Sequence, residues 1–286
     1  MSARHPQTCK PNEIGFAQQS RVEMGLKMKI RLPKGYPYLY ETHLHTSQGS
    51  ACAVDTGKRM AEACKAAGYT GIIVTDHNWG GNTAVNRYLP WKEWVGQFAE
   101  GYEDAKRAGD EVGLDVFFGY EAGYRGTEFL IYGVDKEFML AHEELRTATV
   151  EQQYRLIHEA GGMVVHAHPF REEYYIPEIR LYPEYVDAVE GINATHSNRK
   201  SKAHNDKSFD DKAIDYAGQK KLPMTAGSDI HRTDLFGGGM AFSRKLESIQ
   251  DFIRAVLDGE DYLLTNGEFW FTKDGQKIGE AAADDR

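Results

Sequence analysis

Residues 38–46, YLYETHLHT, form an apolar strand pattern that closes with His43 and His45. Four further apolar runs end in the same way, with a histidine or an acidic residue after the run. These runs are followed by Asp76 and His77, by Glu121, by His166 and His168, and by Asp229 and His231. In an α/β barrel the carboxyl ends of all the strands face one mouth, so residues far apart in sequence converge there. The pattern predicts a cluster of imidazoles and carboxylates at one end of a sheet.

Helix patterns alternate with these strands. Thr56–Ala67 has a helical apolar period and stops at Gly68, a favourable residue just past a helix end. Thr149 and Gln152 have the spacing of a capping box. The remaining predicted helices begin at Pro90 and span residues 209–219 and 246–257. Alternating strands and helices favour an α/β protein with a mainly parallel sheet or barrel.

The composition limits the classes of function. The chain has 286 residues, a net charge of −9 and 41% hydrophobic residues, which suits one large α/β domain. Nucleic-acid-binding surfaces carry a basic footprint, so we do not expect nucleic acid as a partner. No apolar run is long enough to span a membrane, and Cys9, Cys52 and Cys64 make no paired framework. Without an apolar N-terminal segment, these features favour a cytoplasmic protein.

Three segments are expected along the chain. Residues 1–35 are polar without a clear period, and we interpret them as an N-terminal extension. Residues 36–272 carry all the strand and helix patterns and are expected to form the barrel. Residues 273–286 are rich in Gly, Lys and Asp, and we expect them to be a frayed tail.

The residue types at the strand ends indicate metal chemistry. Alternation along a strand places His43 and His45 on the same face, so both imidazoles can reach one ion. Neutral imidazole and carboxylate are ligands that Zn, Mn and Fe accept. A hydrogen-bonded residue at a strand end would explain any one pair, but five together favour a metal-dependent active site.

The ordered motifs resemble those of the polymerase and histidinol phosphatase (PHP) family over about residues 38–265. They read HLHT at 43–46, TDH at 75–77, Glu121 after a strand, HP at 168–169 and GSDIH at 227–231. The resemblance implies a distorted seven-stranded (β/α) TIM-like barrel that holds two or three divalent ions and hydrolyses phosphoesters. Glu121 would be shared between ions, and Glu121 and Asp229 would act in catalysis. The metal ligands that it implies are His43, His45, Asp76, His77, Glu121, His168, Asp229 and His231.

Two departures from the family pattern concern the third ion. Family members with three ions usually carry another histidine a few residues after the H-x-H motif, whereas residues 46–52 here read TSQGSAC. Many members also have a histidine in the strand after the shared glutamate, where this chain reads Glu128-Phe129-Leu130-Ile131. Cys52 is either a substitute soft ligand or a thiol that is merely nearby.

Phosphate recognition requires cationic or N–H donors. Arg171, which follows His168-Pro169-Phe170, is our first candidate because a guanidinium can donate two hydrogen bonds to one phosphate. The other candidates for substrate binding are His196, Asn198 and Arg232. His196 is also the candidate donor of a proton to the leaving oxygen.

The sequence therefore predicts hydrolysis of a phosphoester bond in a small phosphorylated metabolite or nucleotide. Two ions about 3.5–4 Å apart can hold a hydroxide for in-line attack and bind the phosphate oxygens. Three alternatives stay open: a nuclease or exonuclease of the same family, an amidohydrolase-type enzyme with a non-phosphate substrate, and a metal-bound but inactive binding domain.

Overall fold

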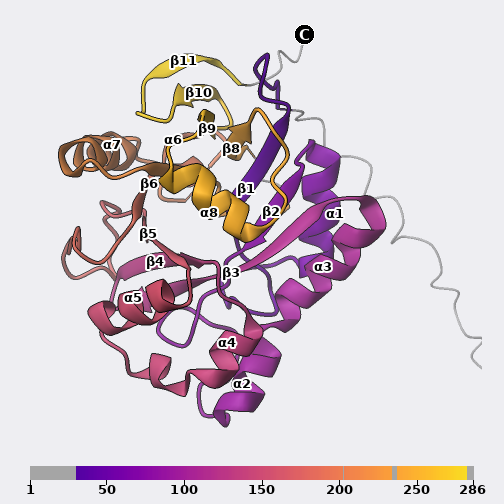
Figure 1. The fold of residues 1–286 in the computed structure, drawn as a ribbon, viewed down its shortest axis with the longest axis vertical. Coiled ribbons are helices and arrows are strands. Elements are labelled where there is room, and N and C mark those ends of the chain that lie inside the picture. Colours follow the sequence, from indigo (N-terminus) through magenta and orange to yellow (C-terminus); the bar gives the residue numbers. More distant parts are fainter. Residues whose placement is uncertain (1–29, 202, 234–236, 282–286) are drawn as a thin grey trace, which may run out of the picture.

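One curled sheet organises the residues that this computed structural model describes, which are 30–201, 203–233 and 237–281 (Figure 1). The strands lie in the order β11-β10-β9-β8-β1-β2-β3-β4-β5-β6-β7. They are β1 (Tyr38–Leu44), β2 (Gly71–Val74), β3 (Asp115–Tyr124), β4 (Thr127–Tyr132), β5 (Met163–Ala167), β6 (Ala188–Asn193), β7 (Met224–Gly227), β8 (Gly238–Phe242), β9 (Tyr262–Asn266), β10 (Phe269–Thr272) and β11 (Lys277–Glu280).

The strand directions confirm an α/β fold but refine the expected distorted barrel. β1, β2 and β3 are parallel, and so are β5, β6 and β7, but β4 runs antiparallel between β3 and β5. A tight turn at Arg125 and Gly126, with φ of 51° and 90°, joins β3 to β4 without a helix. A parallel bridge between Leu44 and Ile230 brings the end of β1 beside the residues after β7. The fold is thus a mixed α/β half-barrel, and a regular seven-stranded (β/α) barrel is not what these pairings form.

The helices follow the predicted signals closely. Thr56 caps α1 by accepting from Arg59 N, and Gly68 ends it with φ of 102°. Thr149 and Gln152 form the capping box of α5. The predicted helix after Pro90 is instead two helices, separated at Ala99. The helices are α1 (Gly57–Ala67), α2 (Trp91–Phe98), α3 (Glu100–Val112), α4 (Lys136–Ala141), the 3-10 helix η1 (Glu143–Arg146), α5 (Val150–Glu159), α6 (Ala194–Ser197), α7 (Ser208–Lys220) and α8 (Ile249–Leu257).

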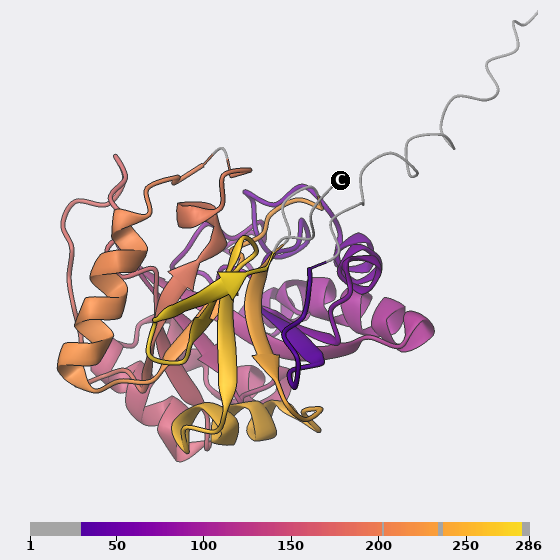
Figure 2. The same cartoon turned by 90° about the horizontal axis from the view of Figure 1, so that it is seen from above.

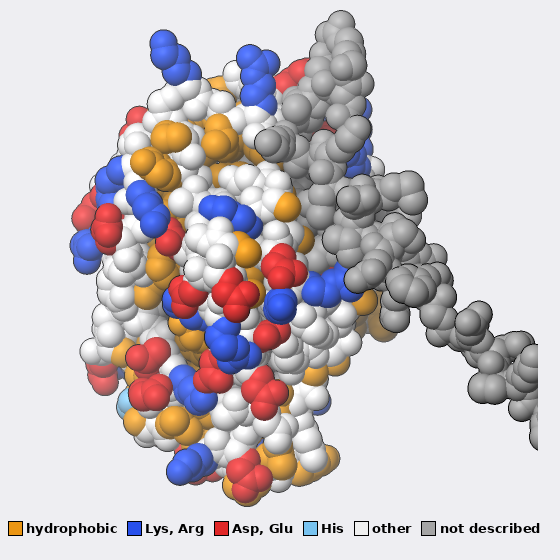
Figure 3. All heavy atoms as spheres, turned by 90° about the vertical axis from the view of Figure 1, so that its right-hand side faces the viewer, with side chains coloured by type: hydrophobic (Ala, Val, Ile, Leu, Met, Phe, Trp, Pro, Cys, Tyr) orange, Lys and Arg blue, Asp and Glu red, His pale blue; other side chains and the backbone are white. Residues whose placement is uncertain are grey.

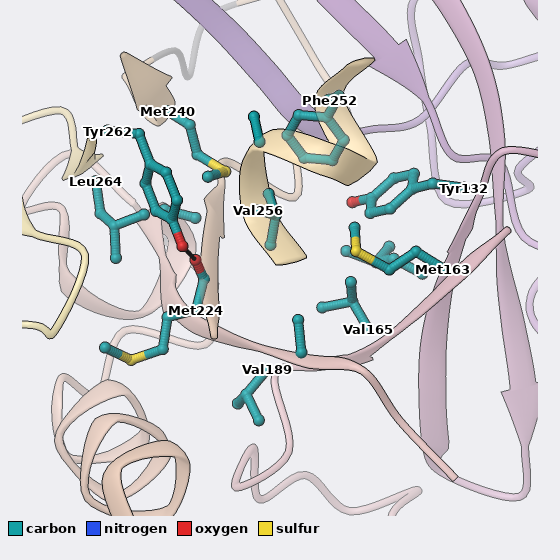
Figure 4. Packing of buried hydrophobic residues seen from close by; sticks show 14 of the residues in the cluster. Tyr132, Met163, Val165, Val189, Met224, Met240, Phe252, Val256, Tyr262 and Leu264 are labelled. Carbon is teal, nitrogen blue, oxygen red and sulfur yellow. Dashed lines mark hydrogen bonds between the residues drawn. The ribbon is translucent and has the colours of Figure 1, made fainter. Parts of the chain in front are cut away.

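Helix α8 closes one end of the curl. Its Phe252 and Val256 are fully buried in a core cluster, and Figure 4 shows them with Tyr132 and Met163 on one side and Tyr262 on the other. Met163 is the first residue of β5, so this core fills the amino-terminal end of the parallel strands. The carboxyl ends of the same strands are left at the opposite end of the curl. That opposite end is where the predicted ligands lie.

Both ends of the described chain are more ordered than the sequence suggested. Ile30 and Leu32 pack against the buried core, and Arg31 N donates to Ala281 O at 2.9 Å. The expected frayed tail contains β11, which pairs antiparallel with β10 (Figure 2). Backbone pairing holds this strand although its side chains are exposed. The remainder of both predicted segments, 1–29 and 282–286, lies outside the described residues.

The protein surface and helix lengths add two observations. Acidic and basic side chains are intermixed on the face seen in Figure 3. Within the described ranges, no helix combines the length and apolarity needed to cross a lipid bilayer.

Candidate metal centre

The carboxyl ends of the parallel strands bring the predicted ligands together. His43 and His45 lie at the end of β1, His77 follows β2, His168 follows β5 and Asp229 follows β7. Glu121 lies within β3 and is fully buried. Of the eight predicted ligands, all except Asp76 belong to a group of side chains close enough to hold an ion.

Four overlapping groups of ligand atoms occur among the described residues, each with its atoms within 4.8 Å of one another. Glu121 belongs to two of them. Its Oε1 lies 3.0 Å from His168 Nε2, and its Oε2 lies 2.8 Å from His77 Nδ1. The groups are His43–His45–Glu121, His43–His168–Asp229, His77–Glu121–Glu128 and His45–His77–His231. Glu121 therefore sits at the centre of the cluster, where one carboxylate can serve two ions.

The hydrogen bonding of the cluster fits divalent ions. Within the described part of the chain, the buried atoms His43 Nε2, His45 Nε2, His77 Nδ1 and Glu121 Oε2 make no hydrogen bond of normal geometry, although His77 Nδ1 and Glu121 Oε2 lie 2.8 Å apart. Buried polar atoms are normally satisfied, and leaving one unsatisfied costs about 1–3 kcal/mol. Four such atoms facing one another are explained by cations that accept their lone pairs.

A second layer of polar groups orients the imidazoles. His43 Nδ1 donates to Glu190 Oε1 at 2.8 Å, which leaves Nε2 facing the cluster. His45 Nδ1 donates to Ser50 Oγ at 3.1 Å, and Ser50 Oγ in turn donates to Asp76 Oδ1 at 2.6 Å. Partners of this kind fix the tautomer of a metal-binding histidine and raise its basicity.

Asp76, which was predicted as a ligand, lies in this second layer and in none of the four ligand groups. Its Oδ1 accepts from Thr46 N at 2.7 Å as well as from Ser50, and its Oδ2 accepts from Thr46 Oγ1 at 2.6 Å. A Cβ atom at Gly49 would lie 2.4 Å from Asp76 Oδ2, so the loop after β1 folds directly onto this carboxylate. Asp76 therefore holds the loop and, through Ser50, positions His45.

Opposite charges within the cluster shift the pKa values of its histidines and carboxylates. Burial lowers the pKa of His43, but Glu190, Asp229 and Glu121 outweigh burial and raise it well above its ordinary value. For Asp229, burial raises the pKa, yet His43 and Arg171 hold it well below its usual range.

The backbone at His168 and Asp229 has φ of 28° and 53°. Such non-glycine conformations cost on the order of 1–3 kcal/mol and cluster at functional sites.

Arg171 lies beside the cluster, as predicted, but its guanidinium already has partners. Nη2 donates to Asp229 Oδ2 at 2.6 Å and to Thr195 Oγ1 at 3.2 Å, while Nε donates to His196 Nε2 at 3.0 Å. The side chain is only 5% exposed. Arg171 is therefore fixed in place by a candidate metal ligand.

The other predicted substrate residues have different surroundings. His196 donates from Nδ1 to Asp210 Oδ1 at 2.8 Å and accepts at Nε2 from Arg171. Burial and the charge of Arg171 place its pKa well below the ordinary value, which favours a neutral ring that supports Arg171. Asn198 uses its amide to donate to Asn266 O and to accept from Lys200 N, which shapes the loop instead of facing a substrate. Arg232 is exposed beside His231.

Two further residues of the centre escaped the sequence analysis. Glu128 Oε1 lies 3.7 Å from His77 Nδ1, and its Oε2 lies 3.6 Å from His168 Nε2. Glu190, in β6, orients His43. The signal for Glu128 was its period-2 spacing with Leu130 and Tyr132, which face the inner core.

Cys52 lies at the solvent side of the centre. The residue is exposed, while its thiol forms hydrogen bonds with His231 and His77. Burial of the sulfur raises the pKa of the thiol, but these two hydrogen bonds outweigh burial and lower it to about 7.

Comparisons with known proteins support the fold. A family model described as PHP-associated matches residues 208–260, the segment with Asp229 and His231. A two-domain protein from Bacteroides vulgatus that contains a predicted PHP-like metal-dependent phosphoesterase is similar in structure. Its TM-score is 0.62 at 15% identity, over 85% of this chain and 69% of that chain. The chain thus has a PHP-like fold and carries a PHP-associated segment, which confirms the resemblance in its motifs.

Two solved structures resemble the chain more weakly. A protein from Bifidobacterium adolescentis, provisionally named as a metal-dependent phosphoesterase, has a TM-score of 0.47 at 15% identity, over 77% of this chain and 95% of that chain. An amidohydrolase from Chromobacterium violaceum, with bound sulfate and no metal, has a TM-score of 0.47 at 16% identity, over 67% of this chain and 87% of that chain. No curated protein matches the sequence.

Proposed function

We propose that this protein is a metal-dependent hydrolase that cleaves a phosphoester bond in a small phosphorylated molecule. The observation that carries the proposal is the set of buried, unpartnered ligand atoms of His43, His45, His77 and Glu121. Bound divalent ions would lower the pKa of a bound water and would place positive charge next to the phosphate oxygens. His43, Glu121, His168 and Asp229 would hold the two inner ions.

The protein's own side chains prepare this centre for a phosphate. Glu190 and Ser50 set the ring orientation of His43 and His45 before any ion binds. His196, neutral and braced by Asp210, fixes Arg171 next to Asp229. A guanidinium held beside the metal ligands would attract the phosphate without a large loss of side-chain entropy.

The neighbouring cavities suggest the character of the substrate. A cavity of about 10 Å³ is lined by Glu128, His168 and Arg171 among others. It shares Glu178 and Ile179 with a larger pocket of about 490 Å³. Among the described residues, those lining the larger pocket include Glu172, Glu173 and Glu178 and no Lys or Arg. We infer that the group beyond the phosphate is small and neutral or cationic, because an acidic wall repels a polyanion.

The acidic pocket also bears on the nuclease alternative. A nucleic acid would add a phosphate at every nucleotide beyond the scissile bond, and these phosphates require a basic groove. Lys212 partly neutralises Glu172, and His204 hydrogen-bonds to Glu173, yet these contacts do not create a basic surface. A phosphomonoester is the substrate class that this site favours.

The direct test is a substrate screen that compares the metal-free protein with the same protein reloaded with metal. Chelator-treated protein reloaded with Zn²⁺ or Mn²⁺ is offered phosphomonoesters, phosphodiesters, amides and lactones. We expect hydrolysis of phosphomonoesters that requires added metal and is lost in Glu121→Gln, while Cys64→Ser, a change in the core of α1, retains it. Turnover of amides or lactones with inert phosphoesters, or phosphoester turnover without metal, would overturn the proposal.

A further inference from the structure

The outermost of the four ligand groups consists of three imidazoles and no carboxylate. The ring of His45 stacks on those of His77 and His231, with centroids 4.4 and 4.3 Å apart. His45 Nε2 and His77 Nδ1 are buried and unpartnered among the described residues. The side chain of His231 is 28% exposed, so this group lies at the solvent side of the centre. An ion here would have no anionic ligand from the group itself.

The loop between β1 and α1 places a thiol against this group. Its backbone is tied on both sides of Cys52, by Ala51 N to Asn82 O at 2.8 Å and by Val54 N to His231 O at 2.9 Å. The second bond fastens the loop to one of the three histidines. Cys52 contacts both His77 and His231 through its thiol. The contact is therefore set by the fold of the loop and not by a flexible side chain alone.

We propose that Cys52 is a thiolate ligand of the ion held by His45, His77 and His231. Binding would release the thiol proton to solvent and form a sulfur–metal bond, which supplies the negative charge that the imidazoles lack. Thiolate is a soft ligand that selects Zn²⁺ and similar ions over Mg²⁺ and Ca²⁺. The inference rests on the proposed metal centre and extends it by giving the outer ion a different ligand chemistry from the inner ones.

Cobalt(II) substitution tests the inference directly. Chelator-treated protein is titrated with Co²⁺ while the near-ultraviolet thiolate-to-cobalt charge-transfer band and the bound cobalt are both measured. A Cys9→Ser/Cys64→Ser double variant is the matched control, because it removes the other thiols and leaves Cys52. In this background we compare Cys52 with Cys52→Ser and Cys52→His.

We expect the double variant to show the charge-transfer band at the intensity of the unmodified protein. Cys52→Ser should lose the band and about one cobalt per chain, whereas Cys52→His should lose the band but keep the cobalt, since imidazole also binds the ion. Bound cobalt without a band in the unmodified protein, or a band that survives in Cys52→Ser, would overturn the role of Cys52 and leave the inner metal centre intact. A folded protein that binds no cobalt would overturn both proposals.

Discussion

Glu190 Oε1 lies 2.8 Å from His43 Nδ1, and neither side chain is exposed to solvent. The carboxylate fixes the ring so that Nε2 points at Glu121 and Asp229, each 3.5 Å away. Glu190 Oε2 also accepts from the backbone N of His168 at 3.0 Å. One carboxylate therefore positions two candidate ligands from different strands.

This relationship predicts a loss of metal affinity in Glu190→Gln. The amide keeps the size of the side chain but no longer supports a basic imidazole, and outer-shell changes of this kind cost about 10–100-fold in affinity or activity. Calorimetric titration of chelator-treated protein with Zn²⁺ measures the effect. Glu260→Gln, at a surface contact with Arg244, is the control and should bind Zn²⁺ normally. Equal affinities in the two variants would remove Glu190 from the centre.

Glu121→Gln should abolish most of the activity without unfolding the protein. Glu121 is common to two ligand groups, and residues that act as a unit fail together, so we expect a loss in kcat of roughly 10³–10⁴-fold. Steady-state kinetics with saturating metal measure this loss, and circular dichroism monitors the fold. Near-normal turnover in this variant contradicts a shared ligand.

Arg171 should contribute to stability and to substrate binding. Arg171→Met leaves buried Asp229 without its guanidinium partner, and breaking a buried ion pair costs up to about 3–5 kcal/mol in metal-free protein. Excess Zn²⁺ should recover much of this loss, because an ion at Asp229 binds only the folded state. Arg171→Lys keeps the positive charge but loses the paired N–H donors of the guanidinium. We therefore expect kcat/KM to fall about ten- to a hundred-fold. Denaturant titrations with and without Zn²⁺ test the first statement, and a loss that Zn²⁺ does not change would contradict it.

A pH-dependent contribution to stability is expected far from the centre. Hydrogen bonds from Arg244 lower the pKa of Asp251 to about 2, against the opposing effect of burial. Because the folded-state pKa lies below the unfolded one, the contribution is present above about pH 4 and is lost as the pH falls towards about 2. The side chain of Arg244 is 40% exposed, so solvent screening limits the value to about 1 kcal/mol.

Asp251→Asn measures this contribution by difference. Urea titrations of the variant and the unmodified protein should differ by about 1 kcal/mol near neutral pH, and the two curves should converge in acid. A gap that persists unchanged below about pH 2 would assign the effect to packing instead of charge.

The candidate ligands were predictable because strand ends share one edge of a sheet. That reasoning brought His43, His77 and Asp229 together. It did not separate Asp76 from them, since a charged residue at a strand end looks the same whether it binds an ion or hydroxyl groups. Thr46 and Ser50, close behind the H-x-H motif, were the sign that Asp76 had partners of its own.

Strand direction explains what was missed. The pattern of a strand carries no direction, and β4 runs antiparallel to its neighbours. The amino end of an antiparallel strand meets the carboxyl ends of the parallel ones, so a ligand in β4 is expected near its start. Glu128 is the second residue of β4. Ligands were expected only at the carboxyl ends of strands, and Glu128 lies at the start of one.

The metal content of the purified protein tests the central claim most directly. Protein prepared without chelator is analysed by inductively coupled plasma mass spectrometry against its chain concentration, with Glu121→Gln as the comparison. The account predicts about two or more divalent ions per chain in the unmodified protein. It predicts fewer in the variant, because Glu121 belongs to two ligand groups. A preparation that is folded and catalytically active but free of metal would contradict it.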